Sequence, residues 1–358
     1  MRFAFTADQI ALADGVRAVL SDQCPPSVVR AVWDDTTDAA SVRPAARLWR
    51  ALADLGLIGA LVPEEHGGLG LNELDVLLGL EESGRVAAPV PLLETAVVAA
   101  RLLTGTGQAD RLAALAAGAL RVSAVLDGSS LLPWTDFCDL ALVFHADAVY
   151  LVPTVQAEPV PSVDRARPLA RLRTPPEVGR SCLVTDDRHR IGSARRAGRL
   201  AAAAQLIGLG ERMLEMTVTH VKQRHQFGVP IGSFQAVKHA LADALLALEL
   251  ARPLVHAAAW SLVHDRDTAA RDVAAAKIRA GEAAGTVART ALQAHGGMGY
   301  TQEYDLHLWL KRTWALQASW GHPAELRPQL AATLLQPSGD HARIPGDERA
   351  NVHDHGRT

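Results

Sequence analysis

The chain has 358 residues, of which 49% are hydrophobic and 21% are charged, and its formal net charge is −3. This length suggests two or three domains with a large buried core. The near-neutral balance argues against a nucleic-acid partner, which would favour a strongly basic face.

Other features of the sequence bear on the cellular compartment. The three cysteines, Cys24, Cys138 and Cys182, are far apart and odd in number, so they indicate neither a disulfide framework nor a metal site. The N-terminal stretch has no basic region ahead of an apolar core, and no apolar run approaches the ~20 residues that span a bilayer. We therefore expect a cytoplasmic protein that binds no metal and enters no membrane.

Residues 1–120 are expected to form an α-helical domain. Apolar residues recur there at three- and four-residue spacing, and Thr6 followed by Gln9 is typical of the capping box that starts a helix. Between residues 121 and 190, short apolar runs such as VSAVL, LALVF, AVYLV and SCLVT are separated by Asp, Gly and Pro. These runs predict the strands of a small β-domain.

Long helices are predicted again over residues 191–336. One apolar stripe, which indicates a buried helix face, is formed by Val237, Leu241, Leu245, Leu248 and Val255. Four helical segments in this region predict a four-helix bundle. Residues 337–358 are polar and rich in Pro, Gly and charge, which predicts a disordered tail.

Two stretches in the bundle region combine residue types that pure helix packing does not require. They are RHQFGVPIGSFQ, residues 224–235, and QAHGGMGYTQEY, residues 293–304. Alone, the first could be a loop with a solvated arginine, and the second could be a helix C-cap with its glycine. With VPEEHGGLGL near the N-terminus, where the glycines favour a structural turn, and APVPLLET after it, the order resembles the acyl-CoA dehydrogenase family.

This resemblance covers roughly residues 5–335 and implies an N-terminal α-domain, a middle β-domain and a C-terminal four-helix bundle. It also implies FAD held between subunits, with both C-terminal motifs reaching the flavin site of a neighbouring subunit. An arginine offers planar, permanently charged donors to a pyrophosphate, amides suit flavin and ribose groups, and glycines allow close backbone approach. The residues implied in FAD binding are Arg224, Gln226, Phe227, Gln235, Gln293, Gly296 and Gly297.

The middle region departs from the family pattern. Relatives usually carry a Thr-Glu-Pro segment followed by Gly-Ser-Asp, which holds the subunit's own flavin and the acyl thioester. Here RVSAVLDGSSLLPWTDF, residues 121–137, occupies the region and the β-domain is shortened. Ser130 and Trp134 could substitute, although a buried tryptophan more often belongs to the core.

The catalytic base is also missing. Removal of a proton from the carbon α to the thioester needs a carboxylate within hydrogen-bond reach. The two positions where relatives carry this glutamate are occupied here by Gly321 and by Gly198, which precedes Arg199. Glu325 or His322 could fill in, although the first is more typical of a helix-start charge and the second of a turn.

The resemblance therefore implies a subunit of an α2β2 heterotetramer formed by two unlike acyl-CoA dehydrogenase chains. The homologous partner would supply the glutamate, the substrate would be a bulky acyl-CoA such as a steroid side-chain thioester, and an electron-transfer flavoprotein would accept the electrons. Two other enzymes stay open, namely a self-sufficient dehydrogenase and a flavin monooxygenase of the same fold. A third alternative is a non-catalytic scaffold subunit that uses the bundle only for assembly.

Overall fold

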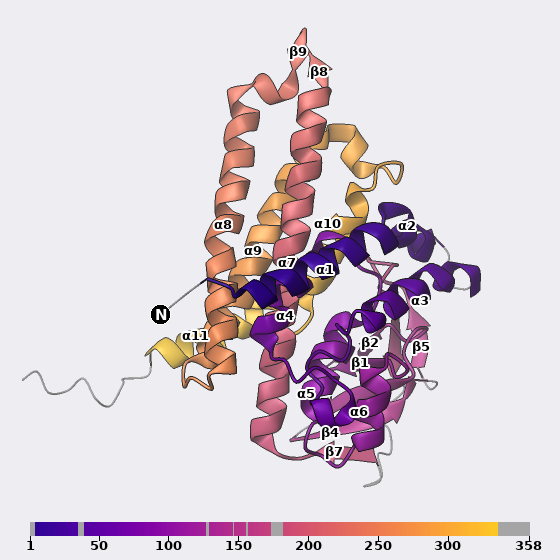
Figure 1. Cartoon of the computed structure of the whole chain (residues 1–358). Helices are drawn as coiled ribbons and strands as arrows, with labels where there is room; N and C mark the ends of the chain where they lie inside the picture. The colour runs from indigo at the N-terminus through magenta and orange to yellow at the C-terminus, as the bar shows by residue number, and fades with distance from the viewer. Residues whose placement is uncertain are drawn as a thin grey trace, which may run out of the picture.

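The structure, a computed structural model, describes residues 4–34, 39–126, 129–145, 147–154, 157–172 and 182–335. The predicted tail, residues 337–358, lies outside these described residues. The fold class expected from the sequence is confirmed, because most of the described chain is helical and a small group of strands lies between two helical regions (Figure 1). The domain boundaries given above remain predictions.

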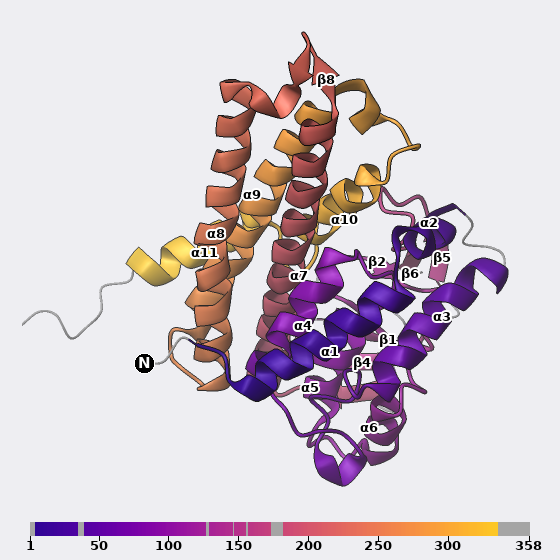
Figure 2. The same ribbon diagram turned by 45° about the horizontal axis from the view of Figure 1, so that its top comes forward.

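The N-terminal region is a compact group of helices beside the lower half of the bundle (Figure 2). Its first helix begins with the predicted capping box. The backbone N–H of Gln9 donates to Thr6 Oγ1 at 3.2 Å, and the backbone N–H of Thr6 donates to Gln9 Oε1 at 2.9 Å. The elements are α1 (Ala7–Gln23), α2 (Pro26–Asp34), α3 (Ala39–Asp54), η1 (Glu64–His66), α4 (Glu73–Arg85), η2 (Leu93–Ala99), α5 (Ala100–Leu103) and α6 (Ala109–Ala116).

The strands form two small sheets. The first has the order β1-β3-β4-β7, in which β1 and β3 are parallel and the other pairs are antiparallel, and the second is antiparallel with the order β2-β6-β5. The four runs recognised in the sequence are the strands of the first sheet, whereas the second sheet was not predicted. The strands are β1 (Val122–Val125), β2 (Leu131–Pro133), β3 (Leu140–His145), β4 (Ala148–Pro153), β5 (Ala157–Val160), β6 (Leu169–Leu172) and β7 (Leu183–Thr185).

The C-terminal helices pack around α7, a 36-residue helix that runs from the strands to the far end of the bundle (Figure 1). The alanine run 201–204 is buried, and a Cβ at Gly208 would lie 1.9 Å from the Glu81 carbonyl oxygen of α4. These small residues therefore serve close helix packing. The elements are α7 (Arg188–Gln223), β8 (His225–Gln226), β9 (Val229–Pro230), η5 (Ile231–Ser233), α8 (Gln235–Val263), α9 (Ala269–His295), η6 (Gly296–Tyr300), α10 (Leu306–Ala318) and α11 (Pro323–Leu335).

The predicted stripe on α8 is wrong at one position. Leu248 and Val255 are buried, but Leu245 is 46% exposed. Its neighbours Leu246, Leu250 and Leu254 are 57%, 58% and 41% exposed, so α8 has a second apolar face that no described residue covers. The spacing of apolar residues in the sequence identifies an apolar face of a helix, whereas the burial of that face depends on which neighbouring elements pack against it.

By length and composition, α8 alone among the described helices could cross a membrane, and 39% of its most apolar stretch is buried. A core helix of a soluble protein meets the same criterion. The expectation from the sequence concerned an uninterrupted apolar run, and α8 is interrupted by Glu249 and Arg252. Large exposed apolar patches mark contact surfaces of proteins.

A buried ionic network joins the three regions at their common junction. Arg312 of α10 forms an ion pair with Asp164, which precedes β6, and Arg312 Nη1 also donates to the carbonyl oxygens of Ala87 and Ala88 at 3.2 and 2.9 Å. Both charged side chains are nearly fully buried. A buried ion pair is stable only with good geometry and further hydrogen bonds, so this network fixes the strands against the bundle.

Candidate functional site

The first motif forms a β-hairpin at the end of α7. Phe227 and Gly228 make its two-residue turn with φ values of +55° and +82°, which is the pattern of a type I′ turn. The Arg224 N–H donates to the His220 carbonyl at 2.8 Å and ends α7, while the Arg224 carbonyl accepts from the Ile231 N–H at 2.8 Å. The hairpin projects at one end of the bundle (Figure 1), and its tip, Phe227, is 91% exposed.

The second motif ends α9 at the same end of the bundle. His295 stacks on His220 of α7 with a ring-centroid distance of 4.2 Å, and Tyr304 lies 4.9 Å from His295. Burial lowers the pKa of both histidines, so the rings are neutral near pH 7 and stack without charge repulsion. Gly296 then adopts φ +57° and ψ −136°, a conformation that favours glycine. The stacked rings therefore hold the two motifs together.

The predicted FAD-binding residues gather at this end and face outward. All of them are exposed. Among the described residues, the polar side chains of this group have no hydrogen-bond partner, and an added Cβ at either glycine would meet no atom within 4 Å. Phe227 packs edge-on against Phe234 at 6.2 Å. The set comprises Arg224, Gln226, Phe227, Gln235, Gln293, Gly296 and Gly297, and its role in binding stays a prediction because a single chain leaves it uncovered.

A cavity of about 610 Å³ lies between the strands and the C-terminal helices. Its lining includes Arg167, Arg195 and Arg199, together with Ser129 and Glu325. Burial, and then the neighbouring Arg195, lowers the pKa of the Arg199 guanidinium. Sequence reasoning did not identify this group of arginines, because two lie on α7 and the third lies before β6.

Both positions expected for the base meet at one wall of this cavity. Trp320 and Gly321 line it, and the Trp320 ring covers Gly198 so closely that a Cβ there would lie 2.4 Å from Cε3. Arg199 Nε donates to the Trp320 carbonyl at 3.2 Å. Residues more than a hundred positions apart are thus neighbours, as expected if either could carry the same base.

The two residues considered as substitutes for the base differ in position. Glu325 lines the cavity and is close enough to oppose the lowering of the Arg199 pKa. The His322 Nδ1 atom accepts the Ala324 N–H at 3.2 Å, so this exposed ring caps the start of α11. Only Glu325 of these two lines the cavity.

Trp134 belongs to the buried core between the strands and the helices. It is 4% exposed, and its indole Nε1 donates to Glu94 at 3.1 Å, while Arg167 pairs with the other oxygen of Glu94 at 3.2 Å. Arg312 lies over the ring at 5.3 Å from its centroid. Ser130 is exposed. The core interpretation of Trp134 therefore fits, and the ring is held by polar partners on its edge and face.

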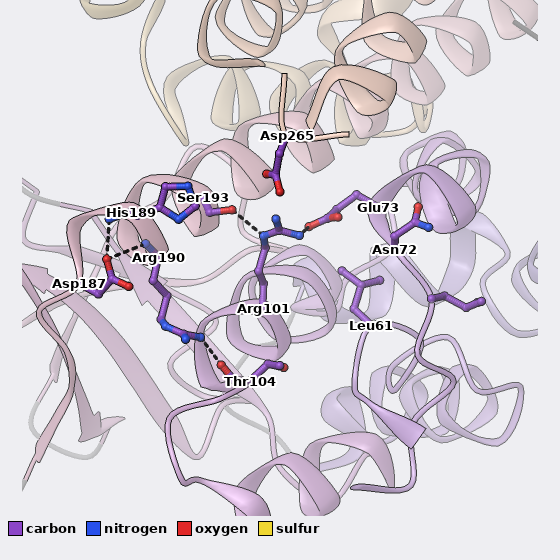
Figure 3. A pocket seen from close by; sticks show the side chains of 11 residues that line it. Leu61, Asn72, Glu73, Arg101, Thr104, Asp187, His189, Arg190, Ser193 and Asp265 are labelled. Atoms are coloured by element: carbon purple, nitrogen blue, oxygen red, sulfur yellow. Dashed lines mark hydrogen bonds and ion pairs between the residues drawn. The ribbon is translucent and has the colours of Figure 1, made fainter. Parts of the chain in front are cut away.

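A second, smaller cavity of about 340 Å³ lies where the N-terminal helices meet the start of α7 (Figure 3). Its central charges are paired with each other, because Arg101 reaches Glu73 at 2.5 Å and donates through Nε to Ser193 at 2.8 Å. Arg190 donates to the Thr104 carbonyl. We regard this cavity as a polar joint between the α-domain and α7. Among the described residues there is no group of three or more His, Cys, Asp or Glu that could hold a metal ion.

Comparisons with known proteins agree with this arrangement. Residues 6–116 match the acyl-CoA dehydrogenase N-terminal domain, and residues 190–335 match the acyl-CoA dehydrogenase C-terminal domain. Acyl-CoA dehydrogenase IpdE2 of Mycolicibacterium smegmatis is 34% identical over 90% of this chain and 98% of the relative. IpdE2 of Mycobacterium tuberculosis is 34% identical over 84% of this chain and 89% of the relative.

Solved structures show the same likeness. A variant of the Tcur3481-Tcur3483 steroid ACAD (acyl-CoA dehydrogenase) has a TM-score of 0.79 at 26% identity, with 91% of this chain and 97% of the other covered. The ChsE4-ChsE5 complex of Mycobacterium tuberculosis has a TM-score of 0.78 at 25% identity, with 94% and 99% covered. The family resemblance stated from the two motifs is thereby confirmed. The chain belongs to the acyl-CoA dehydrogenase family.

Proposed function

We propose that this chain is the base-lacking subunit of a heteromeric, FAD-dependent acyl-CoA dehydrogenase. The observation that carries the proposal is the contrast between two places in one chain. The base positions hold Gly198, which lies against the packed ring of Trp320, and Gly321, which lies against Leu326. The predicted FAD-binding residues, in contrast, are an exposed group at the other end of the bundle, and their polar side chains have no hydrogen-bond partner in the part of the chain that the structure describes. A chain that contributes to a neighbour's site needs the second feature but not the first.

The exposed motif residues fit one edge of FAD. The Arg224 guanidinium has no ion-pair partner among the described residues and can donate to pyrophosphate oxygens, and the amides of Gln235 and Gln293 can both donate and accept. The open space over Gly296 and Gly297 admits a ligand close to the backbone. When bound, FAD supplies the acceptor for the hydride that leaves the β-carbon of the acyl chain. The role of this chain is to hold and orient that cofactor across the interface.

The exposed face of α8 supports the presence of a partner. Leu246, Leu250 and Leu254 line one side of this helix, and Phe234 lies near its start at 38% exposure. An apolar face next to exposed cofactor motifs is the pattern expected where a second bundle packs against the first. We propose a homologous acyl-CoA dehydrogenase subunit as this partner, and the ChsE4-ChsE5 complex is a relative named for two different chains.

The substrate and the electron acceptor belong to the same proposal. A relative at 26% identity is named a steroid ACAD, which supports a bulky acyl-CoA thioester, such as one with a steroid side chain. The reaction is α,β-desaturation, in which the partner's glutamate removes the α-proton. An electron-transfer flavoprotein is the proposed acceptor, in keeping with the family resemblance. We place the complex in the cytoplasm.

The test is flavin content per chain, measured by absorbance, for this chain alone and for the chain co-purified with its partner. We expect little flavin with the single chain and a yellow complex after co-expression. In that complex Arg224→Ala should weaken FAD binding by roughly 30-fold, since one arginine–phosphate contact contributes on the order of 2 kcal/mol. Arg188→Ala is the matched control, because Arg188 is 80% exposed and lies at the opposite end of α7. Unchanged flavin in the Arg224 variant would remove the cross-subunit role.

One observation favours a second candidate, a self-sufficient acyl-CoA dehydrogenase. Glu325 lines the cavity beside Gly321, so its carboxylate is placed to take the proton. In that case the purified single chain would bind one FAD per monomer and oxidise an acyl-CoA without a partner. Glu325→Gln would then abolish turnover while leaving flavin content unchanged. Turnover of the complex that is insensitive to Glu325→Gln would support the first candidate.

A further inference from the structure

Trp320 holds an unusual position at the wall where the missing base would stand. Its backbone has φ +61°, a region that a bulky residue occupies only when its surroundings impose it. The side chain is 5% exposed and packs edge-on against Phe144 at 6.4 Å. Arg199 holds its carbonyl oxygen at 3.2 Å. The position of the indole is therefore fixed by the hydrogen bond to its backbone carbonyl and by the packing of Phe144 against the ring.

The face of this indole lies directly on Gly198. A Cβ at Gly198 would lie 2.4, 2.5 and 2.8 Å from Cε3, Cζ3 and Cδ2 of Trp320. Real Cβ atoms do not come so close to other heavy atoms, and a rigid ring cannot yield as the end of a flexible side chain can. Any side chain at position 198 must displace the indole.

The second base position is blocked in a different way. Gly321 has φ +112°, which L-residues rarely adopt. A Cβ there would also lie 2.9 Å from Cδ2 of Leu326, which is fully buried. A glutamate at Gly321 would thus strain the backbone and collide with the buried side chain of Leu326 on α11. Each position is closed by its own contacts, so one substitution cannot reopen both.

We infer that Trp320 is a fixed steric block that closes position 198 of this chain's cleft to a base, while Gly321 is closed separately by its backbone conformation and by Leu326. This inference rests on the proposed function and deepens it, because it confines proton abstraction in the assembled enzyme to the partner's cleft. The packing of this cavity wall leaves no room for a glutamate at position 198 or at position 321. Restoring the carboxylate alone does not restore the chemistry.

The first experiment is a double-mutant cycle on the co-purified complex, read as the midpoint of thermal unfolding. Gly198→Ala should lower the midpoint by at least about 3 °C, because the added methyl group overpacks the ring contact. In a Trp320→Ala background the same substitution should cause no further loss, since the ring is gone. Gly281→Ala is the matched control, because its Cβ would meet Gln317 Cγ at 3.6 Å, an ordinary contact. Equal losses in both backgrounds would overturn the steric block.

The second experiment uses turnover. The partner's catalytic glutamate is replaced by glutamine, and Gly198→Glu or Gly321→Glu is introduced into this chain in the same complex. Turnover should stay at the background of the partner variant, whereas a rise of about tenfold or more would overturn the inference. Retained activity in the partner variant before any change to this chain would instead contradict the proposed function. The unfolding cycle would still test the packing of Trp320 on Gly198.

Discussion

Lys277 is an ammonium group placed inside the bundle, and its burial should cost stability in a pH-dependent way. It lies on α9, is 1% exposed, and its Nζ donates to the Gln317 carbonyl at 3.2 Å. Burial, helped by the nearby Arg199 charge, lowers the pKa of Lys277 from 10.5 to about 7. Because the folded state disfavours the charged form, folding becomes less favourable wherever the unfolded lysine is protonated.

The magnitude follows from the shift. A change of about 3.5 pKa units corresponds to a cost of about 5 kcal/mol, at about 1.36 kcal/mol per unit. This cost is complete below pH 7, where both states carry the proton. It declines between pH 7 and 10.5 and is absent above that range, where both states are neutral. Lys277→Met removes it and forfeits one hydrogen bond of about 1 kcal/mol, which leaves a net gain of about 3–4 kcal/mol at pH 6–7.

The assay is thermal unfolding of the co-purified complex, wild type and Lys277→Met, at several pH values between 6 and 10. The variant should unfold at a higher temperature at pH 6, and its advantage should shrink steadily above pH 7. Lys238→Met, at an exposed position on α8, should show no such trend. A Lys277 variant that is less stable than wild type at pH 6, or a difference independent of pH, would refute the reasoning.

Three further predictions concern the junction, the hairpin and the interface. Glu94→Ala leaves the buried Arg167 without its carboxylate partner, so we expect the free energy of unfolding to fall by about 3–5 kcal/mol. A midpoint of thermal unfolding within about 1 °C of wild type, on the order of the measurement error, would contradict this expectation. Gly228→Ala places a side chain at φ +82° at a cost of about 1 kcal/mol. If the exposed hairpin relaxes locally to avoid this strain, the FAD affinity of the complex should fall about fivefold in equilibrium dialysis, and an unchanged affinity would contradict the role of the hairpin. Leu250→Asp puts a charge on the exposed face of α8 and should weaken association with the partner at least about tenfold, as measured by size-exclusion chromatography. Full co-purification of the variant with its partner would rule out this face as the interface.

The sequence by itself determined the features that depend on neighbouring residues. The capping box of Thr6 and Gln9, the strand runs of the first sheet and the long helices follow from local spacing, and each is present. The two motifs identified the family because their residue types stand in a fixed order within short stretches. The second sheet was missed, since strands such as AEPV and LARL have no strong alternation and exist through pairing with each other.

Only the tertiary structure decided how distant residues meet. Gly198 and Trp320 are separated by more than a hundred positions, so no periodicity could show that an indole lies on that glycine. The same holds for Leu245 on the open face of α8 and for Lys277 in the bundle core, whose environments come from neighbouring helices. Local propensity selects helices and strands, whereas steric exclusion, burial and exposure arise from the packing of whole elements, and these properties define what the site of this chain can do.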